Sequence, residues 1–265
     1  MGMIKQKIEK FISEIPPLPK SVKECIENLE SDDLIKAAVS ASKDPAFSHY
    51  LLSLVNKPIF GFQKEIRDIH QVFGILGAKK AHQIVSAYYA TLILPKKWRV
   101  FSLNNSDFQI LQSSLIYNWN RILEYEEYGD MHIISAVSLI PASFVVCEKI
   151  FEESIDEVRL LKEQKNISYD EILYKLSGLK IFDIFIMICK EWELNEKSLK
   201  LISYLNEKIE DNSTFSKLAK YLHLLIFYEI SKPIYIEAGL NDFIEFDVEF
   251  VQEVYENFMD IVENK

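Results

Sequence analysis

Apolar residues recur every three or four positions along most of the chain, which is the spacing of a helix that buries one face. The clearest example lies between Asp44 and Gly77. Its two apolar faces are, in order, Phe47, Leu51, Leu52, Leu54 and Val55, then Ile66, Ile69, Val72, Phe73 and Leu76. Asp44 is a good N-cap, and Pro45 is a good first helical residue. Because Asn56 ends the first helix and Gly77 ends the second as a left-handed cap, the pattern predicts two helices joined by a turn at 58–62.

The same spacing predicts helices in the rest of the chain, and no stretch alternates between apolar and polar residues for long enough to indicate a strand. Further helices are expected at 3–12, 20–29, 32–41, 79–94, 107–128, 131–147, 154–164, 168–177, 180–192, 195–209, 213–230 and 247–262. The predicted fold is therefore all-α. We expect an N-terminal helical lobe at 1–95 and a second helical lobe at 96–265 that ends in an acidic helix, the two packing as one compact unit.

The composition agrees with a helical protein that has a large core. The chain has 265 residues, of which 49% are hydrophobic, and its 7 glycines and 8 prolines are too few for a turn-rich β protein. Its three cysteines, Cys25, Cys147 and Cys189, are far apart and set among apolar residues. We therefore expect reduced, buried thiols and a cytoplasmic protein, rather than a disulfide or a metal site.

Charge is distributed unevenly. Residues 1–100 contain 15 basic and 10 acidic residues, whereas the remainder contains 15 basic and 30 acidic ones. The acidic second half would be repelled by phosphate backbones and anionic lipid, so we expect no nucleic-acid or membrane partner, and a protein with a basic face fits better. Residues 131–147 carry no Asp, Glu, Lys or Arg, but they fall short of the roughly 20 residues that span a bilayer and contain Pro141. They predict a buried core helix.

Nine residues between positions 17 and 77 occur in a characteristic order. They are Pro17 and Pro19 (in Pro16-Pro17-Leu18-Pro19), Asp44 and Pro45, Asn56, Phe60 and Gly61, and Leu76 and Gly77. In this order they resemble the HDOD family (HD-related output domain), bacterial signalling modules related to the HD metallophosphohydrolases. The resemblance is clear over residues 12–95 and weaker over 100–230. It implies an all-α fold in which these nine residues are structural.

The resemblance also implies where a metal site would lie. In HD enzymes, His and Asp side chains hold one or two ions, which lower the pKa of a bound water and clamp a phosphate. This chain has no His-Asp dipeptide. By the flanking apolar residues, the family ligands fall around Gln112-Ser113, on Leu139 and Ile140, near Ile181 and near Ile226. Aliphatic residues at these degenerate positions predict that the metal site is lost, so we expect no catalytic residue, no metal ligand and no cofactor.

The five histidines do not restore such a site. His223 lies near the last family position and is the candidate for a residual polar site, although a single His without carboxylate neighbours is typical of a core residue. The other four, His49, His70, His82 and His132, are expected to be packing or surface residues. A glycine-rich phosphate loop and a nucleophile elbow are both absent from the sequence.

These features predict a non-catalytic signal-transduction module that acts through association with a protein partner, a pseudoenzyme related to HD phosphohydrolases. Two alternatives stay open: a residual metal-dependent phosphohydrolase or cyclic-dinucleotide phosphodiesterase, and a domain that senses a nucleotide between its lobes without turnover. Residues 69–86 superficially resemble a helix-turn-helix, but the second helix is too apolar to read bases. The sequence leaves the partner and the oligomeric state open.

Overall fold

The computed structural model describes residues 2–263, and no strand occurs in that range, so the predicted all-α class is confirmed. The first elements are α1 (Gly2–Ser13), α2 (Lys20–Glu30), α3 (Leu34–Ser42), α4 (Pro45–Val55), the 3-10 helix η1 (Pro58–Phe60), α5 (Ile69–Ala87) and the 3-10 helix η2 (Tyr88–Ile93). They are followed by α6 (Asn105–Tyr125), α7 (Met131–Ala136), η3 (Val137–Leu139), α8 (Pro141–Glu153), α9 (Ile155–Arg159), the π-helical turn η4 (Leu160–Gln164), α10 (Tyr169–Ser177), α11 (Ile181–Glu191), α12 (Glu196–Glu207), α13 (Thr214–Ile230), α14 (Pro233–Glu237), η5 (Leu240–Phe243), α15 (Val248–Val251) and α16 (Tyr255–Glu263).

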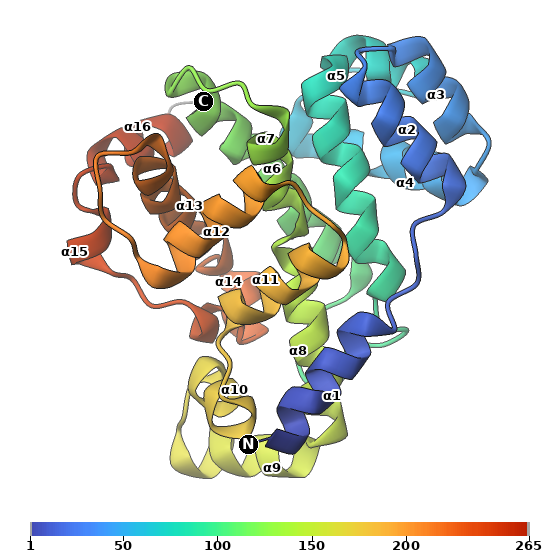
Figure 1. Ribbon diagram of the computed structural model, residues 1–265. Coiled ribbons are helices and arrows are strands. Elements are labelled where there is room, and N and C mark those ends of the chain that lie inside the picture. Colours follow the sequence, from blue (N-terminus) through green and yellow to red (C-terminus); the bar gives the residue numbers. More distant parts are fainter. Residues whose placement is uncertain (1, 264–265) are drawn as a thin grey trace.

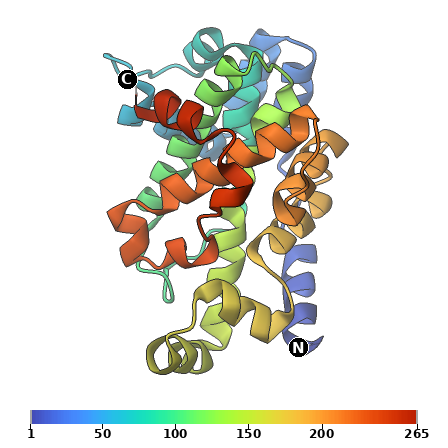
Figure 2. The ribbon, with the colours of Figure 1, turned by 90° about the vertical axis from the view of Figure 1, so that its left-hand side faces the viewer.

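The helices form two groups that share one core. Helices α2 to α5 lie together at the upper right of Figure 1, and α12, α13, α15 and α16 lie at the left. Helix α1 leaves the first group and packs against α8, α10 and α11, at the lower end of the molecule in both ribbon views (Figure 1, Figure 2). One cluster of buried apolar residues extends from Ile8 to Val262. The first helix of the 1–95 range is thus packed on helices of the 96–265 range.

A buried carboxylate holds the linker between η2 and α6. Glu148 of α8 has no exposed surface and accepts hydrogen bonds from the backbone N–H groups of Val100, at 3.1 Å, and Phe101, at 2.9 Å. The N–H of Arg99 is a third donor to the same carboxylate. These amide hydrogen bonds replace the hydrogen bonds to water that the carboxylate loses on burial. They also fix the linker and α8 to each other.

Helix α5 is bent at Gly77, where the sequence predicts a helix end. Gly77 has φ 70° and ψ 173°, a conformation that is open to glycine and strained for other residues. The predicted helix end at Gly77 is therefore confirmed, although its ψ is extended rather than left-handed helical, and α5 consists of two helical segments that meet at this kink. The helix also begins later than predicted: Ile66 precedes it, and the Asp68 side chain caps it by accepting from the His70 N–H.

Three other predicted helices differ in their bounds. The helix predicted at 107–128 begins earlier, because Asn104 and Asp107 form a capping box. The one predicted at 154–164 is α9 followed by a π-helical turn. The acidic helix predicted at 247–262 is broken into α15 and α16, which pack against α13.

The charge-poor stretch is a buried helical run, as predicted. Residues Met131–Glu153, which comprise α7, η3 and α8, are long and apolar enough to cross a membrane by length and composition alone. Their most apolar window is 94% buried inside the protein. Pro141 occupies the first turn of α8, where its missing N–H breaks no helical hydrogen bond. The run therefore forms part of the protein core.

The cysteines also occupy the predicted environment. Cys25, Cys147 and Cys189 are all buried and free. Burial raises the pKa of each thiol, that of Cys25 to about 12. They are therefore neutral, unreactive core residues.

Candidate functional site

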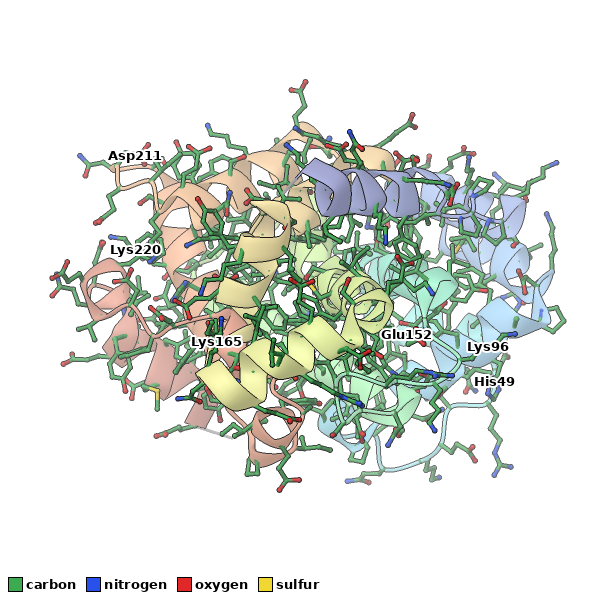
Figure 3. All side chains as sticks on the ribbon, turned by 90° about the horizontal axis from the view of Figure 1, so that it is seen from below. His49, Lys96, Glu152, Lys165, Asp211 and Lys220 are labelled. Atoms are coloured by element: carbon green, nitrogen blue, oxygen red, sulfur yellow. The ribbon has the colours of Figure 1, made fainter. Side chains whose placement is uncertain are left out.

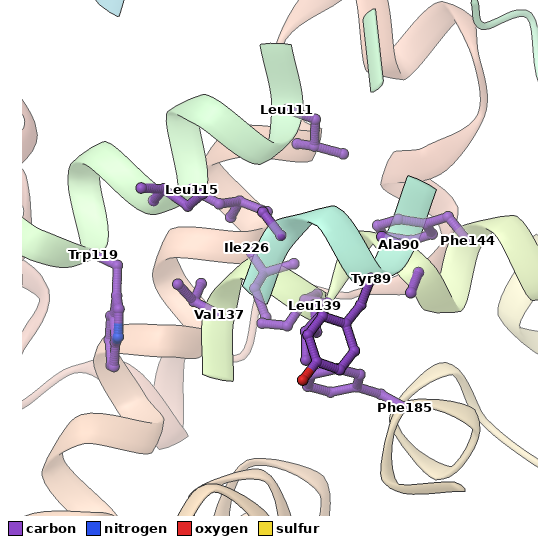
Figure 4. Close-up of a cluster of buried hydrophobic side chains, with 14 of the residues drawn as sticks. Tyr89, Ala90, Leu111, Leu115, Trp119, Val137, Leu139, Phe144, Phe185 and Ile226 are labelled. Carbon is purple, nitrogen blue, oxygen red and sulfur yellow. The ribbon is translucent and has the colours of Figure 1, made fainter. Parts of the chain in front are cut away.

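The positions at which the sequence resemblance places the family's metal ligands lie mostly among apolar side chains. Leu139 of η3 and Ile226 of α13 are fully buried. Figure 4 shows them in one apolar cluster with Tyr89 and Phe185. Ile140, the next residue after Leu139, is also buried. Aliphatic side chains offer no lone pair to a metal ion and exclude the water that such an ion would activate.

Gln112, at the approximate position of the family's first His, is engaged by the protein itself. Its Oε1 accepts a hydrogen bond from the Tyr50 hydroxyl at 3.2 Å, and its Nε2 donates to the carbonyl oxygens of Ala87, at 3.1 Å, and Ser138, at 3.4 Å. Burial raises the pKa of Tyr50, which keeps its hydroxyl protonated as the donor. The buried amide therefore cross-links α4, α5, α6 and η3 as a structural group.

Ile181, the remaining degenerate position, and His223, the candidate for a residual polar site, line a separate hollow of about 550 Å³. His223 is 2% exposed, and its Nε2 lies 3.1 Å from the carbonyl oxygen of Glu245, to which it donates as a neutral ring. Burial lowers the pKa of His223, and its Nδ1 has no hydrogen-bond partner in the described part of the chain. Among residues 2–263, His223 belongs to no group of three potential metal ligands.

The Asn56 side chain holds the loop between α4 and α5. Its Nδ2 donates to the carbonyl oxygens of Leu52, at 2.9 Å, and Ile66, at 2.8 Å. Its Oδ1 accepts from the Ile66 N–H at 2.9 Å. The sequence indicates Asn56 only as the end of a helix, because a contact ten residues away has no local signal.

The same loop contributes Phe60 and Phe62 to a partly exposed aromatic patch, which Ile75 of α5 and Tyr117 of α6 complete. The Phe60 ring stacks on Phe62, with centroids 6.5 Å apart, and meets Tyr117 edge-on at 6.4 Å. Gly61, with φ 69°, allows the sharp turn between the two stacked phenylalanines. Phe62 is 37% exposed and Ile75 is 55% exposed. The patch borders a hollow of about 460 Å³, which Leu76 also lines.

The remaining motif residues set helix starts and one surface hollow. Asp44 caps α4 by accepting two backbone N–H groups of the first turn, and Pro45 is the first residue of that helix, as predicted. The Ser21 hydroxyl donates to Asp44 at 3.3 Å, which links α2 to α4. Pro19 occupies the N-cap position of α2. Pro17 lines a hollow between α2 and the end of α11.

A group of metal-ligating side chains lies at a different place. Glu30 is the last residue of α2, His82 lies in α5, and His132 lies at the start of α7. One ligand atom from each lies within 4.8 Å of the others. The Glu30 Oε1 is 3.8 Å from the His82 Nε2, and the two imidazole rings are 6.1 Å apart and nearly perpendicular. These residues are far apart in the sequence and form no motif, so the sequence predicts only that His82 and His132 are packing or surface residues and does not single out Glu30.

Neighbouring residues hold the His82 ring in place, and one side of the group formed by Glu30, His82 and His132 faces a hollow. His82 is 5% exposed, and its Nδ1 lies 2.6 Å from the Ser135 hydroxyl. The neighbouring His82 side chain lowers the pKa of Glu30, which is therefore ionised at neutral pH. All three side chains border a hollow of about 240 Å³ that Trp192 and Ser198 also line. Two imidazoles and a carboxylate that face an open space are a ligand set for a divalent transition metal.

Comparison with known structures places the fold. The chain resembles an HDOD domain protein from Geobacter sulfurreducens, with a TM-score of 0.59 and 16% identity over 97% of this chain and 94% of that one. It resembles a "Putative signal transduction protein" from Marinobacter aquaeolei VT8, with a TM-score of 0.62 and 16% identity; the match covers 95% of this chain and 58% of that one.

A third structure is a "Putative metal-dependent phosphohydrolase" from Shewanella amazonensis SB2B, with a TM-score of 0.54 and 11% identity over 89% of this chain and 94% of that one. At such identities the likeness concerns the fold alone. No curated protein matches the sequence significantly. The HDOD domain model matches residues 15–208, which is most of the chain and includes the motif residues described above. The chain belongs to the HDOD domain family.

Proposed function

We propose that this protein is a non-catalytic signal-transduction module that acts by associating with another protein. One observation supports the proposal: Leu139 and Ile226, to which the sequence resemblance assigns two of the family's metal-ligand positions, are buried and pack in one apolar cluster (Figure 4). A phosphohydrolase of the HD type needs an ion there to activate water and neutralise the phosphate. Without ligands the fold retains its shape and its surfaces, and those are what a regulatory partner would recognise.

The aromatic patch is the surface that best fits a protein partner. Phe62 and Ile75 are large, exposed apolar side chains, and aromatic residues are enriched in the centres of protein interfaces. The stacking of Phe60 on Phe62 and the Asn56 clamp hold the loop in one conformation. Less entropy is therefore lost on binding than with a flexible loop.

The catalytic part of the proposal is tested by turnover. The purified protein is loaded in turn with Mn²⁺, Fe²⁺ and Zn²⁺ and incubated with nucleotides, cyclic dinucleotides and a generic phosphodiester, beside an active HD phosphohydrolase. We expect product formation no faster than in buffer with the same ions. Metal-dependent turnover would overturn the proposal and make the protein a residual phosphohydrolase.

The association is tested by affinity capture with surface variants. The wild type and Ile75→Asp are used as baits in extract of the native cells, with Ile236→Asp as the control, because Ile236 is 50% exposed outside the patch. We expect a protein retained by the wild type and the control but lost with Ile75→Asp. A bound protein that all three baits retain equally would show that the patch is not the interface.

A further inference from the structure

We propose that Glu30, His82 and His132 bind one divalent transition-metal ion of the Zn²⁺ type, with an open coordination position toward the adjoining hollow. Two neutral imidazoles and one carboxylate are the ligands of open zinc sites, in which water or another ligand takes the fourth position. The hollow of this site is also lined by Leu139 and Tyr89, so it adjoins the apolar cluster, but none of its three ligands is one of the degenerate family positions. The ion-binding proposal therefore does not depend on the function proposed above.

The separations suit an ion after a small closure. Zinc bonds of roughly 2.0–2.1 Å in a tetrahedral site place ligand atoms about 3.3 Å apart. Here the three ligand atoms lie within 4.8 Å of one another, and the Glu30 Oε1 is already 3.8 Å from the His82 Nε2. The Glu30 side chain is 45% exposed, so it is free to move toward an ion, while His82 is fixed in the core.

The buried histidine is oriented as a ligand. Its Nδ1 is paired with the Ser135 hydroxyl at 2.6 Å, and its Nε2 points to Glu30. When the proton resides on Nδ1, the ring donates to Ser135 and its Nε2 lone pair faces the carboxylate. A polar partner on the far nitrogen is the usual support of a metal-bound imidazole.

The position of Glu30 in its helix also favours a cation. Glu30 is the last residue of α2, where the helix dipole is negative and a carboxylate is unfavourable. Among the described residues, its recorded ion-pair partner is His82, and no Lys or Arg lies within ion-pair distance of it. A bound metal ion would supply the positive charge that this helix end lacks.

The open side of the site has polar groups for a fourth ligand. Ser198 and Trp192 line the hollow, and the indole N–H of Trp192 has no hydrogen-bond partner within residues 2–263. A water molecule or a small anion on the ion would fill this space. Because Glu30 belongs to α2 and His132 to α7, the ion would also tie the N-terminal group of helices to the second lobe.

The test is calorimetric titration of chelator-stripped protein with Zn²⁺ and with Co²⁺. We expect one ion per chain and a visible Co²⁺ spectrum of low coordination number. At Zn²⁺ concentrations about 100 times the dissociation constant, the unfolding midpoint should rise by about 5–10 °C. Glu30→Gln, which keeps the shape of the exposed side chain, and His132→Ala should each weaken binding at least tenfold.

Matched controls separate this site from incidental binding by histidine. His49 and His70 are exposed, and His49 lies at the outer edge of the molecule in Figure 3. Zn²⁺ affinity should be unchanged in His49→Ala and His70→Ala, and apo Glu30→Gln and His132→Ala should unfold cooperatively near the wild-type temperature. The proposal is overturned if the wild type binds no ion stoichiometrically, or if both ligand variants keep the wild-type affinity. Because turnover is not measured, the outcome is independent of the test of the non-catalytic function.

Discussion

Three hydrogen bonds of the Asn56 side chain tie Leu52 and Ile66 together across the loop that carries the aromatic patch. Asn56→Ala removes all three and leaves the N–H and C=O of Ile66 without these partners. We expect a loss of about 2–3 kcal/mol in the free energy of unfolding, measured by urea denaturation. The exposed Asn212 is the control, and Asn212→Ala should change stability by less than about 0.5 kcal/mol. Equal effects of the two variants would show that the clamp contributes nothing.

Glu148 and Glu152 lie one turn apart on α8 but depend on different interactions. Glu148 is fully buried and accepts from three backbone N–H groups of the linker, whereas Glu152 is partly exposed and pairs with Arg99 at 2.9 Å. Glu148→Gln places an amide N–H₂ against amide donors, so we expect it to cost about 2–4 kcal/mol of stability. Glu152→Gln, on the same side of the molecule as Lys96 in Figure 3, should cost about 0–1 kcal/mol. Thermal and urea unfolding of both variants provide the comparison, and a Glu148→Gln protein as stable as Glu152→Gln would contradict it.

At the scale of the element, the bend of α5 depends on the backbone of one glycine. A Cβ at Gly77 would meet no atom within 4 Å, so the cost of Gly77→Ala is the backbone strain at φ 70° alone. We expect a destabilisation of about 1–3 kcal/mol. Gly74 lies earlier in the same helix, has ordinary helical backbone and also has open space for a Cβ. Gly74→Ala should therefore stabilise the protein by about 0.5–1 kcal/mol. If both substitutions shift the urea midpoint in the same direction, the kink is not held by the glycine.

Helices whose boundaries follow from local chemistry are predictable from this sequence, and those set by distant contacts are not. The cap at Asp44 and the proline after it place α4 correctly. The sequence contains no local signal for the break between α15 and α16, whose neighbours are distant in the sequence: α15 packs on α13, and α16 packs on α13 and α6. The same limit applies to sites. The absence of a His-Asp pair can be seen in the sequence, but Glu30 and His132 come together only because α5 packs against both α2 and α7.

At the scale of the whole molecule, the buried His223 makes stability depend on pH. Its pKa in the folded protein lies below the ordinary value of about 6.5, because burial opposes the charged ring. The unfolded chain therefore takes up the proton first, so stability is complete above about pH 6.5 and falls as the pH drops below it. Between pH 7.5 and 5.5 this group can remove at most about 1.4 kcal/mol. His223→Gln should reduce that loss, and the exposed His70→Gln should not.

Only the difference between variants isolates this effect, because other groups titrate in the same molecule. Burial raises the pKa of Asp170, which borders the same hollow. Its contribution to the pH dependence of stability is therefore opposite to that of His223, because the stability that the charged carboxylate costs at high pH returns as the pH falls. Lys208 and Asp247 act on His223 in opposite directions. Parallel unfolding curves of the wild type and His223→Gln across this pH range would show that the ring is not shielded from water.

The apolar cluster that contains Leu139, Ile226 and Tyr89 joins residues of both lobes (Figure 4), so its residues should act together. Leu139 of η3 and Ile226 of α13 are fully buried in it, with Tyr89 and Phe185 (Figure 4). Leu139→Ala and Ile226→Ala should each cost about 2–4 kcal/mol, through lost apolar burial and the cavity left behind. Because the two cavities would merge, the double variant should differ from the sum by about 0.5 kcal/mol or more. Leu139→Ala combined with Ile8→Ala in α1, which packs against other helices, should be additive. Additive costs for Leu139 and Ile226 would mean that the two side chains do not fill one common space. The argument against catalysis from a shared apolar cluster at these positions would then fail.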